Sequence, residues 1–335
     1  MIVHDYVATA EPVGSHVLVE RYSLGVKSAT IRSEMAEMSE RGYLRQPHTS
    51  AGRVPSDLGY RFYVSRLMVP MPIAPEETDR IRVAVQSVSS ELDTIIRKTC
   101  GLLTAMTRLP AVATAPDTAD TRIKQVFVSP ASERQVLLVV LYSTGHTETR
   151  LVLDLTVSAS DALILANALN ERLSGQAVSA LATISDAVPN EIAHLSASYR
   201  RLLTEIAAVT RTLSDNAPVF VEGAEAVLHH PEFRDVEKLS GFLSLLQERA
   251  ALLEMLEQSL AQAAPSPVRY AIGDEIRATV SEYAVVSAPY RIGNRERGSI
   301  GVLGPTRMDY ARASAAVELM ARTLSDVLTR LSVAP

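Results

Sequence analysis

Small hydroxyl side chains and an arginine fall at the start of a short predicted helix, in an arrangement that suits contact with double-stranded DNA. The candidate contacts on this helix are Ser28, Ala29, Thr30, Arg32 and Ser33. The N-terminal end of a recognition helix is where base edges are met. Arginine can donate two hydrogen bonds to a guanine edge, and the methyl groups of Thr and Ala can contact thymine methyls. The free N–H groups of a helix start also favour a phosphate.

A short hairpin with basic and polar residues follows this helix directly. Two predicted strands, over residues 44–46 and 53–55, flank its loop. The candidate contacts to phosphates or to the minor groove are Arg45, His48, Thr49, Ser50, Gly52 and Arg53. Gly52 is expected at a loop position with positive φ. Two helices joined by a glycine turn are common, but the adjoining basic hairpin makes a winged helix-turn-helix a much more specific prediction.

Three short helices and a fourth after the hairpin are predicted to position these contacts. They cover residues 2–9, 15–22, 28–40 and 57–69. Ser15 and Ser28 are expected N-caps, because a hydroxyl can accept a hydrogen bond from a free N–H group of the first turn. Ile31, Met35 and Met38 share one face of the third helix and are expected to be buried.

The distribution of charge suits a confined anionic partner. The whole chain of 335 residues has a net charge of −5. Between Arg41 and Arg66, however, five arginines accompany a single acid, Asp57. A local basic stripe on an acidic protein is typical of a limited nucleic-acid interface. Two of these arginines, Arg61 and Arg66, are expected on a solvated face of the fourth helix.

Composition limits the class of protein. A hydrophobic content of 47% over 335 residues is ample for two or three domains. The single cysteine, Cys100, excludes an intramolecular disulfide and multi-cysteine zinc sites, and it fits a reducing compartment. The first residues lack the pattern of a signal peptide, and the longest apolar run, 136–141, is too short to span a bilayer. These features predict a soluble cytoplasmic protein that makes no membrane contact.

The remainder of the chain is predicted to be a multidomain α+β arrangement. Strands are expected over 126–128, 135–142, 147–155, 268–272, 284–290 and 299–303, and helices over 76–108, 160–174 and 309–331. Neither β-rich part closes alone, so we expect both to form one sheet domain interrupted by an insertion. The predicted organisation is a DNA-binding head over 1–70, a linker and long helix over 71–121, a first β-rich part over 122–175, a mainly helical insertion over 176–265 and a second β-rich part over 266–335.

The predicted insertion contains an apolar seam with alternating spacings of three and four residues. Its central members are Tyr199, Leu202, Ile206, Val209 and Leu213. A second run with the same spacing extends from Leu239 to Leu260. A narrow apolar seam requires a partner. The two helices could pack on each other as a hairpin, or they could also pack against a second subunit, and we predict a homodimer through the first seam.

Motifs for catalysis or for metal binding are missing from the sequence. It contains no phosphate loop followed by Lys and Ser or Thr, no His-Glu-x-x-His and no Gly-x-Ser-x-Gly. Gly298, Gly301 and Gly304 are explained by a tightly packed strand. Residues 229–232 (HHPE) crowd three potential ligands around a proline, which suits the start of a helix better than a metal site. No catalytic residue, cofactor or metal is predicted.

Six segments together carry a more specific pattern. They are residues 6–15 (YVATAEPVGS), 28–32 (SATIR), 42–55 (GYLRQPHTSAGRVP), 59–63 (GYRFY), 231–233 (PEF) and 300–310 (IGVLGPTRMDY). With these motifs the chain resembles the HrcA family of heat-inducible transcription repressors over nearly its whole length. The resemblance implies a winged-helix head, a GAF-like domain and an inserted dimerisation domain.

The same resemblance implies a function. Members of the family repress chaperone operons, bind an inverted-repeat operator called CIRCE and are kept in their active form by the GroEL chaperonin. The alternative is a winged-helix regulator gated by a small molecule in the GAF-like domain. Family members usually have several more residues before the segment that matches Ile2–Tyr6, so the first helix, at about two turns, is expected to be marginally stable.

Overall fold

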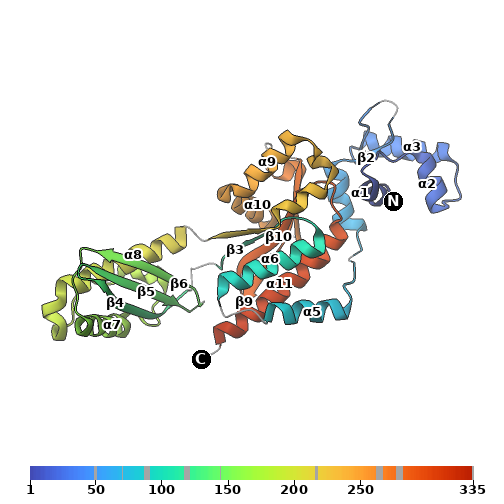
Figure 1. Cartoon of the computed structure of the whole chain (residues 1–335). Coiled ribbons are helices and arrows are strands. Elements are labelled where there is room, and N and C mark those ends of the chain that lie inside the picture. The colour runs from blue at the N-terminus through green and yellow to red at the C-terminus, as the bar shows by residue number, and fades with distance from the viewer. Residues whose placement is uncertain are drawn as a thin grey trace.

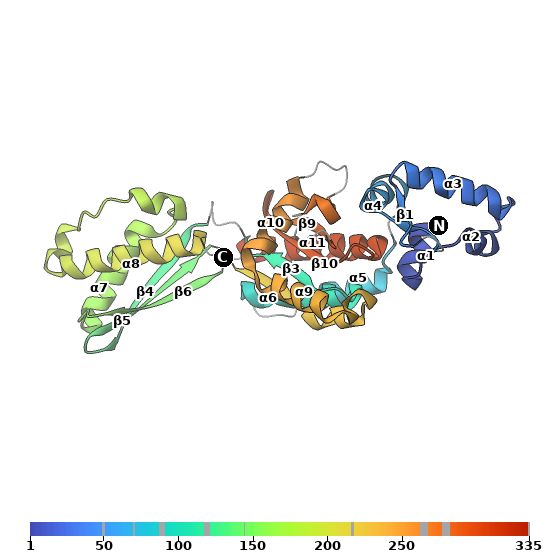
Figure 2. The same ribbon diagram turned by 90° about the horizontal axis from the view of Figure 1, so that it is seen from above.

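The structure, a computed structural model, is elongated and consists of three parts in a row (Figure 1). It describes residues 1–48, 51–69, 71–86, 91–116, 121–143, 145–215, 218–261, 267–276 and 282–333. We call residues 1–67 the head and residues 121–215 the outer unit, and the body is the part between them in space. The head and the outer unit lie at opposite ends of the molecule in both views (Figures 1 and 2).

The head contains the predicted helices and hairpin. Its elements are α1 (Ile2–Thr9), α2 (Ser15–Tyr22), α3 (Ser28–Glu40), β1 (Leu44–Arg45), β2 (Val54–Pro55), α4 (Asp57–Phe62) and the π-helical turn η1 (Tyr63–Leu67). The prediction that Ser15 and Ser28 cap their helices is wrong. Gly14 and Lys27 occupy the N-cap positions, and the two serine hydroxyls lie 2.8 Å apart in a hydrogen bond that joins α2 to α3.

A small apolar cluster holds the three helices of the head together. Its buried members are Val13, Leu18, Ile31, Met35 and Leu44. Met38, which was expected to be buried, is exposed at the edge of this cluster. The Ser56 hydroxyl accepts a hydrogen bond from the amide of Gly59 and donates one to the carbonyl of Gly42, which fixes the start of α4 against the end of α3.

One buried carboxylate ties α1 to α2. Asp5 is 1% exposed, and its Oδ1 accepts hydrogen bonds from Arg21 Nη1 at 2.7 Å and from the Tyr22 hydroxyl at 2.8 Å. Burial alone would raise the pKa of Asp5, but the hydrogen bonds from Arg21 and Tyr22 outweigh it and hold the pKa below its ordinary value. The ionised form of Asp5 therefore stabilises the folded head.

The first prediction concerns the acid stability of the head. A carboxyl group whose folded pKa lies below its unfolded value of about 4 stabilises the fold above that pH, and the contribution is lost as the pH falls through the folded pKa. We expect Asp5→Asn to melt below the wild type at pH 7. The difference in melting temperature, measured by circular dichroism, should narrow below about pH 4. A difference that stays constant down to acid unfolding would contradict the assignment.

The body is built on a five-stranded antiparallel sheet with strand order β7-β3-β10-β9-β8. The strands are β3 (Ala111–Thr114), β7 (Val219–Glu222), β8 (Arg269–Ile272), β9 (Tyr283–Ile292) and β10 (Arg295–Pro305). Alternate residues of β9 belong to different clusters, with Ala284 and Val286 on one face and Tyr283 and Val285 on the other. A sheet that is apolar on both faces needs helices on both sides.

Helices cover both faces of this sheet. The helices α5 (Pro75–Gln86), α6 (Leu92–Thr107) and α11 (Tyr310–Val333) pack on one face, and α9 (Val236–Gln247) and α10 (Arg249–Ala261) pack on the other. Short 3-10 turns, η4 (Ala224–His229), η5 (Pro231–Arg234) and η6 (Gly273–Glu275), connect these elements. The single long helix predicted over residues 76–108 is therefore wrong, because two helices cover this range.

The close packing proposed for the glycines of β10 is confirmed. A Cβ atom at Gly301 would lie 2.5 Å from the carbonyl oxygen of Val286 on the neighbouring strand, and one at Gly298 would lie 2.5 Å from the Tyr290 hydroxyl. Both distances are too short for any side chain.

The outer unit has a separate three-stranded antiparallel sheet, and this corrects the predicted organisation. Its elements are β4 (Ile123–Ser132), β5 (Gln135–Tyr142), β6 (Thr147–Leu153), α7 (Ala159–Leu173), η2 (Val178–Thr183), η3 (Asn190–Leu195) and α8 (Ser196–Asp215). The strands predicted over 126–155 do not share a sheet with those over 268–303. The whole outer unit is instead inserted between β3 and β7, two short strands that the sequence analysis missed.

The apolar seam of α8 is filled within the same chain. Tyr199, Leu202 and Ile206 are fully buried in one cluster with the inward-facing side chains of β5 and with α7. Val209 is also buried, and the side chain of Leu213 lies outside the described residues. The second seam, on α9 and α10, packs on the body sheet. The two seams therefore face different sheets, and a hairpin of these helices is excluded.

Candidate DNA-binding interface

Helix α3 exposes most of its predicted contacts. Ala29, Thr30, Arg32 and Ser33 are all exposed near its N-terminal end. Within the described part of the chain, Arg32 has no ion-pair or hydrogen-bond partner in the protein. Its guanidinium is therefore available to a guanine edge or a phosphate. Ser28 is only half exposed, and its hydroxyl is engaged by Ser15, so it is a weaker candidate.

Lys27 is a candidate that the sequence analysis omitted. It is exposed at the N-cap of α3, where no side chain caps the helix. A cation next to the uncapped N–H groups of a helix start adds to their attraction for a phosphate. The position of Lys27 immediately before a predicted N-terminus was a signal for this role.

Hydrogen bonds hold the hairpin against the helices of the head. The backbone of Arg53 pairs with that of Val13 through two hydrogen bonds of 2.9 Å, and Arg53 Nε donates to Ser39 Oγ at 2.9 Å. Arg53 is therefore half-buried against α3, whereas His48 is exposed. Thr49 and Ser50 lie outside the described residues.

Gly52 is required by a close approach of two segments, and the expectation of a positive φ is wrong. Gly52 is not among the glycines with positive φ. A Cβ atom there would lie 2.4 Å from the carbonyl group of Val13. The glycine therefore lets the hairpin lie directly against the segment between α1 and α2.

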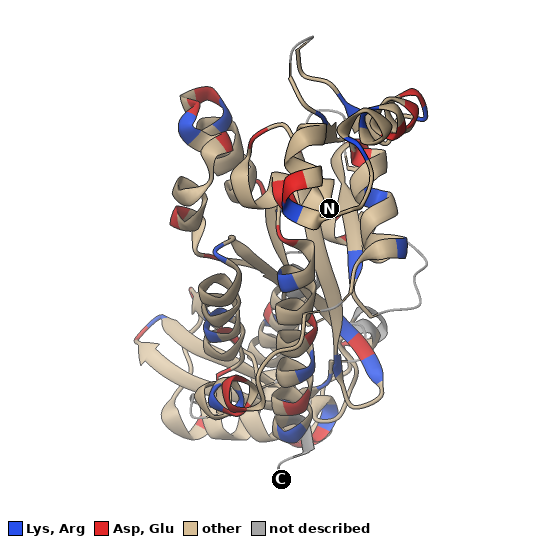
Figure 3. Cartoon of the chain, turned by 90° about the vertical axis from the view of Figure 1, so that its right-hand side faces the viewer, with Lys and Arg blue, Asp and Glu red and all other residues tan. Residues whose placement is uncertain are grey.

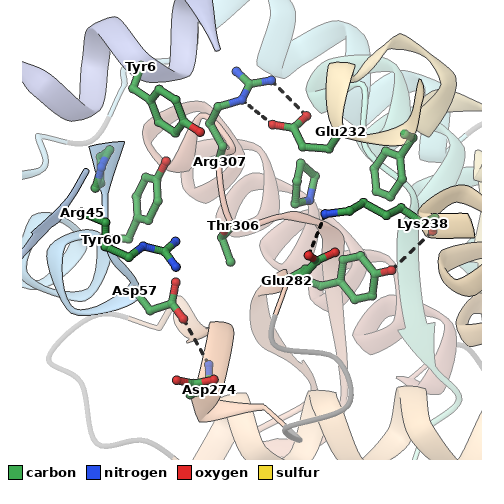
Figure 4. A pocket seen from close by; sticks show the side chains of 14 residues that line it. Tyr6, Arg45, Asp57, Tyr60, Glu232, Lys238, Asp274, Glu282, Thr306 and Arg307 are labelled. Atoms are coloured by element: carbon green, nitrogen blue, oxygen red, sulfur yellow. Dashed lines mark hydrogen bonds and ion pairs between the residues drawn. The ribbon is translucent and has the colours of Figure 1, made fainter. Parts of the chain in front are cut away.

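Arg45 is turned away from the hairpin tip. Its side chain points toward Asp57 and lines a cavity of about 360 Å³ between the head and the body (Figure 4). Burial raises the pKa of Asp57, an effect that the Asp274 amide and the nearby charge of Arg45 oppose. Arg45 therefore faces the body, and it is a weaker candidate for phosphate contact than Arg32.

Charges of both signs alternate over the head, as Figure 3 shows. Glu34, Glu37 and Glu40 lie on α3, and Arg41 pairs with Glu37 at 2.5 Å. The expected basic stripe is thus broken up by acidic side chains. Arg61, which was expected to be solvated, instead pairs with Glu275 of the body, whereas Arg66 is exposed.

Metal binding, thiol chemistry and a membrane span find little support in the described part of the chain. No group of three or more His, Cys, Asp or Glu side chains is placed to hold a metal ion there. His230 hydrogen-bonds to the carbonyl of Arg108, and Glu232 pairs with Arg307. Burial raises the pKa of Cys100 to about 12, so its thiol stays protonated. Among the same residues, no helix combines the length and apolar character needed to cross a bilayer.

Comparisons with known proteins identify the family of this chain. The family model for the HrcA protein C terminal domain matches residues 93–313. The heat-inducible transcription repressor HrcA of Symbiobacterium thermophilum is 38% identical over 329 residues, which cover 97% of this chain and 95% of that protein. The protein of the same name from Pelotomaculum thermopropionicum is 34% identical over 336 residues, which cover 98% and 94%.

A solved structure has the same overall fold. A crystal structure of a hypothetical protein at 2.2 Å resolution matches 98% of this chain and 96% of its own, with a TM-score of 0.63 and 24% sequence identity. The sequence relatives carry the assignment of family, and that family consists of transcription repressors, which are not enzymes. The chain belongs to the HrcA family of heat-inducible transcription repressors.

Proposed function

We propose that this protein represses heat-shock chaperone operons by binding an inverted-repeat, CIRCE-type operator as a dimer in the cytoplasm. The observation that carries the proposal is the exposed start of α3, where Ala29, Thr30, Arg32 and Ser33 lie beside an uncapped helix N-terminus. Membership in a family of repressors supports the same conclusion. In this proposal α3 is the recognition helix and the β1–β2 hairpin is the wing of a winged helix-turn-helix over residues 1–70.

The second prediction tests this assignment. We expect Arg32→Ala to cost about 1–3 kcal/mol on the operator, because a base contact is lost, with a smaller effect on random DNA. The matched control is Arg134→Ala, since Arg134 is an exposed arginine of the outer unit that pairs with Asp154. Fluorescence anisotropy titrations on both duplexes measure the difference. Equal weakening on operator and random DNA would show that Arg32 only neutralises phosphate.

We further propose that the body is a GAF-like domain and that the outer unit is the inserted dimerisation domain. The surface we assign to the dimer is the open face of the three-stranded sheet, away from α7 and α8. Its exposed apolar residues are Phe127, Leu137, Leu151 and Leu153. The register places Leu137 opposite Leu151, and Phe127 opposite Val139. A second copy fits this face, because a twofold operator needs a twofold dimer and such an interface is self-complementary.

The GroEL chaperonin is proposed as the partner that maintains the active form. A footprint of the purified protein on its own chaperone-operon promoter, with and without GroEL, tests both parts of the proposal. Protection of an inverted repeat supports operator binding, and greater protection with GroEL supports the chaperonin's role. Protection that does not change with GroEL would remove the chaperonin from the mechanism.

A small-molecule-gated regulator is the second candidate, and the cavity between head and body favours it. The body sheet is packed with side chains on both faces, so a ligand there would find little room. The cavity lined by Arg45, Asp57 and Arg307 is a more suitable place. Native mass spectrometry of the purified protein distinguishes the candidates, because a ligand-gated regulator retains a stoichiometric small molecule.

A further inference from the structure

The head is attached to the body by an ion pair with restricted geometry. Arg61 Nε of α4 donates to Glu275 Oε1 at 2.5 Å, and Arg61 Nη2 donates to Glu275 Oε2 and, at 2.8 Å, to the Tyr270 carbonyl. Glu275 also accepts a hydrogen bond from the amide of Ile272 at 2.9 Å. A bidentate pair of this kind fixes direction as well as distance. It therefore resists rotation of α4 on the body.

An ion pair within the body orients an arginine that also binds a second helix of the head. Arg307 Nε donates to Glu232 Oε1 at 2.5 Å, and its Nη2 donates to Glu232 Oε2 at 3.2 Å (Figure 4). The remaining Nη1 donates to the carbonyl oxygen of Val7 in α1. Arg307 is 9% exposed, so this contact is shielded from solvent. Arg61 thus fixes α4 to the body, and Arg307, which Glu232 orients, fixes α1.

Apolar packing also joins the head to the body between Arg61 and Arg307, beside the cavity that Arg45 lines. Tyr60 and Val64 belong to the main core of the body, and the Tyr60 ring lies 5.6 Å from that of Tyr310. A Cβ atom at Gly273 would lie 1.8 Å from Asp57 Oδ2, so only glycine permits the observed approach. The head consequently contacts the body at several points around this cavity, and residues 68–74 alone do not determine its position.

The fixed junction determines where the recognition helix lies relative to the body. In a dimer, the distance between two recognition helices follows from how each head is seated on its own body. Half-site spacing is a geometric property, because the two helices must enter major grooves on one side of the duplex. We propose that Arg61 and Glu275 are positioning residues that restrict the spacing of the half-sites the dimer binds, without touching DNA. This inference rests on the proposed function, namely that a dimer reads an inverted repeat.

The experiment compares operators whose central spacer is shortened or lengthened by one or two base pairs. The proteins are the wild type, Glu275→Gln, Arg61→Lys and the control Glu296→Gln, which removes one charge from an exposed ion pair with Arg291 on the body. A duplex with a single half-site is titrated in parallel, since its affinity depends only on an intact head.

We expect the wild type and Glu296→Gln to prefer the native spacer by a factor of roughly ten or more, because a misplaced second half-site forfeits the gain from bivalent binding. In Glu275→Gln the ratio of the affinities for the native and the altered spacers should fall toward one. Binding to the native operator should weaken, and binding to the single half-site should not change. Arg61→Lys keeps the positive charge but loses the two parallel N–H donors of the guanidinium. It should therefore give an intermediate preference for the native spacer.

Each remaining outcome counts against one specific statement. A wild type that binds no inverted repeat at any spacing would refute the proposed function. A wild-type preference that persists in Glu275→Gln would refute the positioning role alone. Loss of single half-site binding in both variants would also refute it, because the pair would then support the fold of the head itself.

Discussion

Replacing Leu137 and Leu151 together with glutamate is expected to convert the protein to monomers and to weaken operator binding by roughly 100- to 10,000-fold, because binding of the second half-site is no longer intramolecular. The two residues face each other across β5 and β6 and are 36% and 45% exposed in the single chain. Glutamate at these positions is solvated in a monomer and therefore leaves the fold intact. In a dimer it would place unpaired charges in an apolar interface.

The measurement combines sedimentation equilibrium with anisotropy titrations on the operator. The matched control is Leu163→Glu with Ile164→Glu, which introduces the same two charges at exposed positions of α7, 63% and 40% exposed. The control should remain dimeric and bind the operator normally. If the Leu137 and Leu151 variant stayed dimeric, the interface would have to lie on another part of the chain.

Leu202→Ala is expected to destabilise the outer unit by about 2–5 kcal/mol, because it removes a fully buried side chain and leaves a cavity. This expectation differs from the one the seam alone suggests, in which such a change separates subunits and leaves every domain folded. Urea unfolding followed by circular dichroism measures the loss.

Thr204→Ala on the exposed side of the same helix is the control, with an expected change within about 0.5 kcal/mol. The Leu202→Ala dimer should dissociate into monomers only when the outer unit unfolds. If Leu202→Ala were monomeric but as stable as the wild type, the apolar seam of α8 would have to form the subunit interface.

These two predictions differ because a local sequence pattern identifies apolar residues but not the surface that covers them. A spacing of three and four residues in α8 correctly indicates one apolar face, but it does not identify what covers that face. Here a sheet of the same chain covers it. The surface assigned to the second copy is the open face of a sheet, which the spacing of a helix does not indicate.

Long-range pairing accounts for the main error of organisation. The strands around 126–155 and 268–303 were recognised from β-branched and alternating residues, but their partners are not encoded in local pattern. Strands β3 and β7 are four residues each and pair across an intervening stretch of about a hundred residues. Without them, the insertion was placed too far along the chain.

The head was more predictable, because glycine and proline mark its boundaries and its helices are local structures. The errors there concern individual side chains with distant partners. Arg61 sits on a helix face that looks solvated, and its acceptor, Glu275, lies 214 residues further along the chain. Arg45 and Arg53 likewise satisfy the pattern of a basic hairpin, while their geometry directs them to Asp57 and Ser39.

The placement of the outer unit also bears on how such a protein could have evolved. Strands β3 and β7 are antiparallel neighbours, and the Ala115 amide donates to the Pro218 carbonyl at 2.9 Å, so the two points where the chain leaves and re-enters the body are adjacent. A tight turn could join them without moving any other strand. An ancestral gene could therefore have acquired this segment in one step, already folded, without any rebuilding of the core of the body.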